Sequence, residues 1–183
     1  MHHQLHIPFA FVIIIAAVFP ASALAQESAQ HGRVQRHFSA EDAGVKSRVT
    51  IPREVMEILG EDDMVKSQME NEEPRPPQVP QSWFSASKIR LGPTKANDLI
   101  VQATGPLAGV NVVVFWIFIH THEDEWKLAL MVPAHDFIVT QTRVNKYRNL
   151  EANAMTCCAI TTARFRFDGR VYKRYFAETK EIK

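Results

Sequence analysis

The sequence predicts an α+β protein that is mostly β, with an antiparallel sheet domain preceded by a short helical segment. Residues 111–119, N-V-V-V-F-W-I-F-I, are an almost unbroken run of branched and aromatic side chains, which favour a strand. Asp168-Gly169 lies between two strand-like runs, a pattern typical of a β-hairpin. Apolar residues at helical spacing lie before residue 74, where a proline-rich run follows.

Composition indicates one globular domain with an appendage. A chain of 183 residues with 46% hydrophobic and 22% charged residues can build one substantial core. The net charge of +1 argues against nucleic-acid binding. Residues 41–73 hold ten acidic and four basic residues, and residues 143–183 hold ten basic and four acidic ones. These are either ordinary solvated surfaces or oppositely charged faces for partners.

Residues 1–25 are typical of a secretory signal peptide. The apolar run Ile7 to Phe19 is followed by the small-residue pattern Ala23-Leu24-Ala25. The run is shorter than the roughly 18 to 20 apolar residues of a spanning helix, which argues against a retained membrane anchor. We expect cleavage before Gln26, export to the periplasm or the extracellular space, and no stable membrane span afterwards.

A polar arm and two short helices are expected next. Residues 26–48 lack sustained periodicity, which is typical of a mobile arm. The first helix has Thr50 as its expected N-cap, Pro52 in its first turn and Gly60 at its end. The acidic residues 61–63 favour the start of a second helix, because negative charge there complements the helix dipole.

A domain boundary is expected in the proline-rich run 74–81. Its four prolines favour an extended connector, with recognition by a proline-binding partner domain as the alternative. The predicted organisation is therefore an arm with short helices at 26–73, the connector at 74–81, and an antiparallel β-rich domain at 82–183.

The strands of this domain follow from apolar runs and turn signals. The run at 111–119 is apolar on both faces, so it should be a central strand with material packed on each side. Pro133 is expected to end the strand at 126–132. Residues 145–153 are expected to form a loop. The expected strands are 99–103, 111–119, 126–132, 137–140 and 159–167.

The Asp168-Gly169 hairpin suggests a binding face. A two-residue type I′ turn would pair Phe165 with Tyr172 on an apolar face. The opposite face would carry like charges, which are unfavourable unless something negative covers them, such as the acidic segment 61–73. We interpret this basic face as a contact for an unknown protein or an anionic envelope ligand. Its residues are Arg164, Arg166, Lys173 and Tyr175.

His120 and His122 are the candidate metal ligands. They are two residues apart, so in a continuing strand both project from one face and could chelate a divalent transition metal. The alternative is an ordinary hairpin end, where polar residues gather for solvation. The further candidate ligands are Glu123, Asp124, Glu125 and His135.

Other reactive residues give weaker patterns. His135-Asp136 is either an oriented general base or an ordinary turn, and no nucleophile or phosphate-loop motif accompanies it. Cys157 and Cys158 are the only cysteines. Their alternatives are a strained ring joining them, an intermolecular bridge, or two sheltered thiols. In a strand one of them would face the core, so one buried thiol is expected.

Three short motifs carry a family resemblance. They are N-D-L-I-V at 97–101, F-W-I-F at 115–118 and R-F-D-G-R-V-Y at 166–172. With these motifs the chain resembles a family of uncharacterised exported bacterial proteins, over roughly Trp83 to Phe176. The resemblance implies an exported protein, and it implies no established activity.

The family is in turn distantly similar to FG-GAP and integrin-like repeats, which carry calcium loops. In the family, a loop rich in Asp, Asn and Gly often precedes the aspartate-leucine strand. The corresponding residues 92–98 read G-P-T-K-A-N-D, which keeps only Asn97 and Asp98 as oxygen ligands. The resemblance therefore comes without the calcium loop.

The sequence favours an exported, non-catalytic binding or interaction protein of unknown ligand, with an anionic ligand on the basic hairpin face. No cofactor motif is present. The alternative is a metal-binding protein or metal-dependent hydrolase that uses His120 and His122, with a divalent transition metal as its cofactor.

Overall fold

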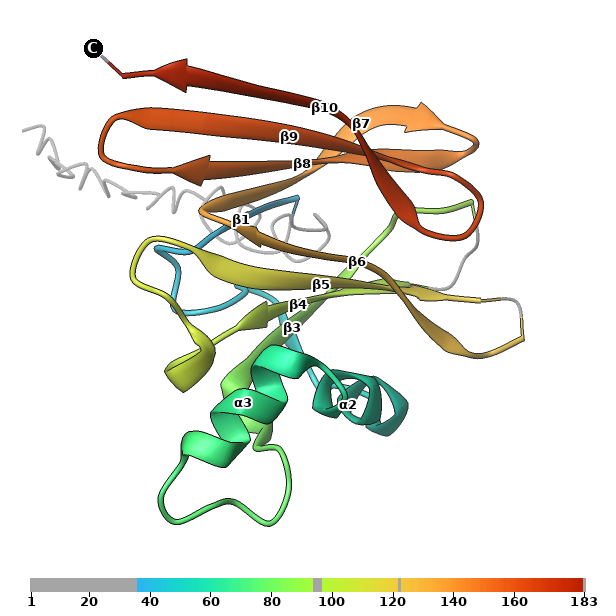
Figure 1. The fold of residues 1–183 in the computed structure, drawn as a ribbon. Helices are drawn as coiled ribbons and strands as arrows, with labels where there is room; N and C mark the ends of the chain where they lie inside the picture. The colour runs from blue at the N-terminus through green and yellow to red at the C-terminus, as the bar shows by residue number, and fades with distance from the viewer. Residues whose placement is uncertain (1–35, 94–96, 122, 183) are drawn as a thin grey trace, which may run out of the picture. The chain divides into compact units, whose positions relative to one another are not determined.

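The computed structural model of this protein describes residues 36–93, 97–121 and 123–182 (Figure 1). The chain divides into two units, Met1–Arg33 and Val34–Lys183. All described residues belong to the second unit. The fold below is that of this unit alone.

The predicted signal peptide at residues 1–25 lies outside the described residues. Among the described residues, no helix is both long enough and apolar enough to cross a membrane. Export and localisation therefore stay predictions from the sequence.

Two five-stranded antiparallel sheets and two helices make up the fold, which confirms the predicted class. The core sheet, in spatial order, consists of β2 (Arg48–Val49), β3 (Phe84–Ile89), β4 (Asp98–Ala103), β5 (Val113–His120) and β6 (Trp126–Ala134). The outer sheet, in spatial order, consists of β1 (His37–Ser39), β7 (Asp136–Val144), β8 (Tyr147–Met155), β9 (Ala159–Phe167) and β10 (Tyr172–Glu181).

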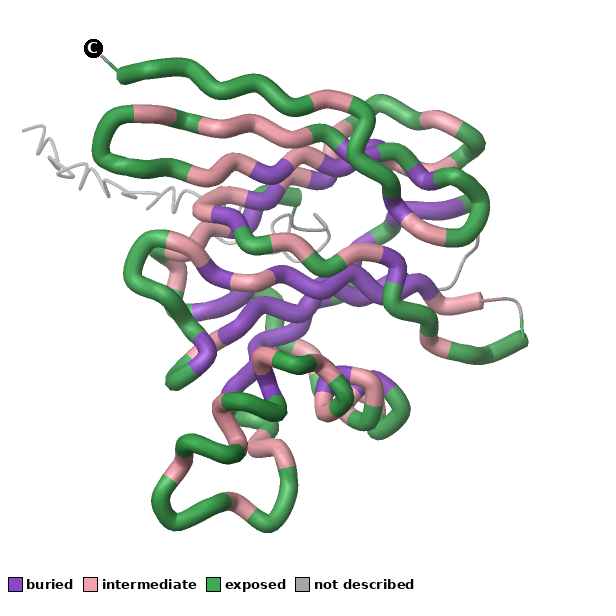
Figure 2. Tube along the Cα trace, in the orientation of Figure 1, coloured by how far each residue is buried: buried purple, intermediate pink, exposed green. Residues whose placement is uncertain are grey.

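The core sheet lies between the outer sheet and the helices α2 (Arg53–Gly60) and α3 (Asp63–Asn71) (Figure 1). In β5, alternate side chains therefore face different layers. Phe115 stacks on Phe137 of the outer sheet at 5.4 Å, and Trp116 Nε1 donates to Asp62 at 3.0 Å on the helix side. The prediction of a central strand covered on both faces is confirmed, and Figure 2 shows β5 buried along most of its length.

The chain passes from one sheet to the other at the junction of β6 and β7. The expected strand end at Pro133 is wrong, because β6 continues to Ala134 with Pro133 opposite Val114. β6 is the edge strand of the core sheet. A proline, which has no N–H, is tolerated there because one side of an edge strand is unpaired. The chain then returns to the outer sheet with β7, which begins at Asp136.

Both helices form where the sequence predicts them. α2 ends at Gly60 as expected, but its N-cap is Pro52 rather than Thr50, and no side chain caps it. α3 starts at the predicted acidic cluster. There Asp62 Oδ1 accepts from Met64 N and Val65 N, while Asp62 Oδ2 accepts from the Trp116 ring. One carboxylate thus starts α3 and ties it to the core sheet.

The predicted polar arm is wrong for its described part, residues 36–48. β1 pairs with β7 through Phe38 opposite Phe137, and Phe38 is 1% exposed. β2 pairs with β3 at the edge of the core sheet. The proline-rich run 74–81 therefore does not separate two domains, because the strands before it complete the sheets after it.

The predicted loop at 145–153 is also wrong, because β7 and β8 form a tight hairpin. Val144 pairs with Tyr147, and the two residues between them, Asn145 and Lys146, have φ angles of 53° and 68°. Two positive φ values are the mark of a type I′ turn. Asparagine adopts them readily, and the lysine that follows hides the pattern in the sequence.

The β9–β10 hairpin has a different register from the predicted one. Tyr172 pairs with Phe167 rather than Phe165, because the loop has four residues, 168–171. Asp168 Oδ1 accepts from the backbone N–H groups of Arg170 and Val171, which stabilises this longer loop. The two-residue turn is therefore replaced by an aspartate-centred one.

Candidate binding face

A β-bulge in β10 organises the solvent face of the outer sheet. Arg174 lies opposite Phe165 and Phe176 lies opposite Arg164, so Tyr175 is an extra residue. The Arg166 guanidinium lies 3.8 Å from the centre of the Tyr175 ring, and that of Arg164 lies 5.0 Å from the Phe176 ring. The bulge therefore places two neighbouring aromatic rings under two arginines.

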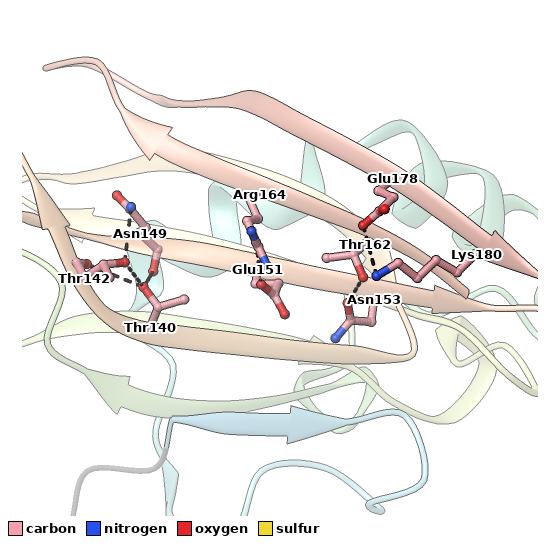
Figure 3. A network of polar contacts seen from close by, with 9 residues as sticks. All are labelled: Thr140, Thr142, Asn149, Glu151, Asn153, Thr162, Arg164, Glu178 and Lys180. Atoms are coloured by element: carbon pink, nitrogen blue, oxygen red, sulfur yellow. Dashed lines mark hydrogen bonds and ion pairs between the residues drawn. The ribbon is translucent and has the colours of Figure 1, made fainter. Parts of the chain in front are cut away.

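Polar contacts cover the rest of this face (Figure 3). Arg164 Nε donates to Glu151 Oε2 at 2.8 Å, and Thr162 Oγ1 donates to Asn153 at 2.8 Å. At one end, Asn149 Nδ2 donates to the Thr142 hydroxyl, which lies 2.8 Å from that of Thr140. At the other end, Lys180 pairs with Glu178 at 3.3 Å. The network spans four strands, β7 to β10.

A pocket of about 450 Å³ opens on this face. Its lining combines hydroxyl, amide, carboxylate and guanidinium groups with one aromatic ring. Asn149 lies in it with 6% exposure, and its Oδ1 has no hydrogen-bond partner. An unpaired buried carbonyl oxygen is costly, so a ligand that donates a hydrogen bond would be stabilised there. The lining residues are Thr140, Thr142, Arg143, Val144, Asn149, Leu150, Glu151, Arg164, Arg166 and Tyr175.

Three of the four predicted contact residues line this pocket, namely Arg164, Arg166 and Tyr175. Lys173 turns instead to Asp168, with Nζ 2.8 Å from Oδ2. Their hydrogen bond is the main cause of a lowered pKa for the Asp168 carboxyl. Sequence reasoning missed the residues from β7 and β8, because it took Asn145 to begin a loop.

The two arginines of this face differ in whether an acidic side chain neutralises them. The hydrogen bond from Arg164 to Glu151 raises the pKa of the Arg164 guanidinium. Arg166 makes no hydrogen bond or ion pair with any described residue, and only its stacking on Tyr175 holds it. The acidic segment 61–73 does not cover this face, since α3 packs on the core sheet. Glu151 and Asp168 supply the local negative charge.

His120 lies in a separate polar hollow at the end of β5. Its Nε2 is 3.0 Å from Asp124 Oδ1, and its ring contacts that of Trp126 at 4.6 Å. Glu54 and Glu125 also line this hollow. His122 lies outside the described residues. Within residues 36–93, 97–121 and 123–182, no three His, Cys, Asp or Glu side chains form a group that could hold a metal. Metal binding stays a prediction.

His135 is not brought to His120. Its Nδ1 lies 3.0 Å from the Asn111 carbonyl oxygen, and its Nε2 lies 3.7 Å from Glu41. Asp136 pairs with His37 at 3.0 Å rather than with its neighbour. These contacts are those of a junction between two sheets, and they do not form an oriented general base.

Asp98 has a structural role. Its carboxylate is 1% exposed and accepts from the backbone N–H groups of Leu91, Gly92 and His120. Burial raises the pKa of Asp98, and these hydrogen bonds partly oppose that rise. One of the two possible calcium ligands is thus occupied by the loop before β4 and by the end of β5.

The two cysteines lie in the β8–β9 turn, so the expectation of one buried thiol is wrong. Both are exposed, and their Sγ atoms are 2.8 Å apart. Thr156 and Ala159 close the turn, with Thr156 N donating to the Ala159 carbonyl oxygen at 2.9 Å. The hydrogen bond between the thiols raises the pKa of Cys158.

Comparisons with known proteins identify no relative of this chain. No protein-family model, no curated protein and no solved structure matches the chain. The resemblance to exported bacterial proteins and to integrin-like repeats therefore stays a prediction.

Proposed function

We propose that this protein is an exported, non-catalytic binding protein that holds an anionic ligand on the solvent face of the outer sheet. The observation that carries this proposal is Arg166, which lines the pocket with its guanidinium over the Tyr175 ring and has no acidic partner among the described residues. The contact holds the guanidinium beside the ring, and its N–H groups make no hydrogen bond with any described residue. A guanidinium can bind a carboxylate or phosphate group through two parallel hydrogen bonds.

The surroundings of Arg166 favour an oxygen-rich ligand. Glu151 neutralises Arg164, so the anion would be drawn to Arg166 rather than to the whole face. The hydroxyls of Thr140 and Thr142 and the free Oδ1 of Asn149 add hydrogen-bonding groups at the far side of the pocket. A ligand with an acidic group and several hydroxyls, such as an acidic saccharide of the envelope, would pair with Arg166 through its acid and with these polar groups through its hydroxyls.

The test compares two charge reversals. Arg166→Glu and Lys88→Glu change the net charge equally, and Lys88 is exposed on β3 in the other sheet. On an immobilised heparin column, used as a polyanion of known composition, Arg166→Glu should elute at clearly lower salt than the parent protein. Lys88→Glu should elute close to the parent protein. Equal shifts for both variants would show a general charge effect and contradict the proposal.

A second measurement locates the anion. Titration with trigalacturonate, followed by nuclear magnetic resonance, should shift the Arg166 Nε–Hε signal. The signal of Arg53, which is exposed on α2 and paired with Glu57, should stay constant. A shift confined to residues away from the outer sheet would contradict the assigned face.

A further inference from the structure

A second, apolar cleft lies on the opposite side of the outer sheet. It has a volume of about 480 Å³, is partly open to solvent, and lies between β6 of the core sheet and the inner face of β8, β9 and β10. Val132 and Pro133 form one wall, and Ala152, Ala154 and Ala163 form the other. Its size is in the range of small-molecule sites in proteins.

The cleft exists because small side chains meet across two strands. Ala152 of β8 lies directly opposite Ala163 of β9, so neither strand sends more than a methyl group across the gap. Farther along the same face, Leu150 and Phe165 form the next opposing pair, and both are buried. Protein interiors are normally packed without voids, so this row of alanines leaves room that the two sheets do not fill.

Among the described residues, Arg174 is the one charged residue that lines the cleft. It pairs with Phe165 next to the bulge, which turns it to the inner face while Tyr175 lies under Arg166 on the solvent face. It makes no hydrogen bond or ion pair with any described residue. A cation at the edge of an apolar cleft complements a molecule with a hydrocarbon body and an anionic end.

We propose that this cleft binds a medium-chain carboxylate, with its acyl chain against the alanine wall and its carboxylate on Arg174. The carboxylate end is favoured by the exposed position of Arg174, where the charged pair stays partly hydrated. The chain end is favoured by the apolar lining of Val132, Pro133 and the alanines. This site does not depend on the anion site at Arg166, which lies on the other face.

The first experiment titrates the full chain with octanoate, decanoate and decanol by isothermal calorimetry. Decanoate should bind roughly tenfold more tightly than octanoate, because two further methylenes leave water. Decanol should bind at least about tenfold more weakly than decanoate, because it lacks the charge that pairs with Arg174. Equal affinity for decanoate and decanol, or no binding of either, would overturn the proposal.

The second experiment fills the cleft. Ala163→Leu should weaken decanoate binding more than about tenfold, since the leucine would occupy the space of the chain. Thr161→Leu, at a second partly buried position that lines the same cleft, serves if Ala163→Leu fails to fold. Ala108→Leu is the matched control on an exposed loop of the core sheet, and its affinity should be unchanged.

The third experiment separates the two sites. Arg174→Gln should abolish the preference for decanoate over decanol, whereas Arg166→Gln should leave it intact. If Arg166→Gln removes decanoate binding and Arg174→Gln does not, the ligand occupies the solvent face and the cleft proposal fails. If the parent protein sediments as a dimer and Ala163→Leu makes it a monomer without changing decanoate affinity, the cleft is an interface between copies, which also overturns the proposal.

Discussion

Strand β5 of the core sheet and strand β9 of the outer sheet differ in how they are covered. Phe115 to Phe118 in β5 are all buried, because the outer sheet covers one side and the helices the other. In β9, Phe165 and Phe167 are buried while Arg164 and Arg166 are exposed. A strand covered twice has no free face for a ligand, whereas the singly covered outer sheet leaves one face open for the pocket near Arg166.

The two strands should therefore respond differently to substitution. Changes in β5 remove packing on either side and cost stability. Changes at exposed positions of β9 should leave the core intact and affect the proposed anion binding. Four substitutions test this contrast, from the largest expected effect on stability to the smallest.

Phe115→Ala should have the largest effect. The ring is fully buried and stacks on Phe137, so its loss leaves a cavity between the two sheets. We expect a decrease of about 4 kcal/mol in the free energy of unfolding, measured by urea denaturation. Arg166→Ala is the control in β9 and should cost less than about 0.5 kcal/mol. Similar losses for the two variants would refute the contrast.

Asp98→Asn should destabilise the protein in a pH-dependent way. An amide cannot accept all three backbone N–H groups and places a donor among them, at a cost of about 2 kcal/mol. Because the pKa of Asp98 is raised above its ordinary value of 3.8, its contribution is fully present below that value and declines as pH rises through the folded-state pKa. The advantage of the parent protein in urea denaturation should thus shrink from pH 4 upwards; a growing advantage would contradict it.

Asp62→Ala should cost about 1.5 kcal/mol, because it removes the cap of α3 and leaves the buried Trp116 N–H without its acceptor. The substitution should increase the hydrogen-exchange rate of the α3 amides more than that of the outer-sheet amides. Asp63→Ala, one residue further on and without the Trp116 contact, is the matched control. Equal acceleration in both variants would show that helix charge, and not the link to β5, holds the layer.

Glu151→Gln should have the smallest effect on stability, below about 1 kcal/mol, because its pair with Arg164 is partly exposed. Its effect on binding should be larger. Without Glu151, Arg164 joins Arg166 as an available cation, so retention on heparin should increase. Glu57→Gln, which removes an acid of the same charge from α2, should leave retention nearly unchanged. An equal increase for both would weaken the assignment of the binding face.

Local chemistry was enough to predict several elements of this fold. The branched and aromatic run of β5, the acidic start of α3 and the Gly60 end of α2 act through neighbouring residues in the chain. The same holds for the alternation in β9, which predicted Arg164 and Arg166 on an exposed face. The loop prediction at 145–153 failed because Asn145-Lys146 is a rare form of the type I′ turn.

The sequence by itself determined the fold class, the central strand and the alternation that exposes the arginines, because side-chain periodicity requires only local geometry. The tertiary structure decided which side chains form the two candidate sites. The bulge at Tyr175, the pairing of Arg164 with Glu151 and the alanine row facing β6 all depend on which strands become neighbours. Residues far apart in the chain acquire shared chemistry only when register brings them together, and a shift of one residue would send each to the other face.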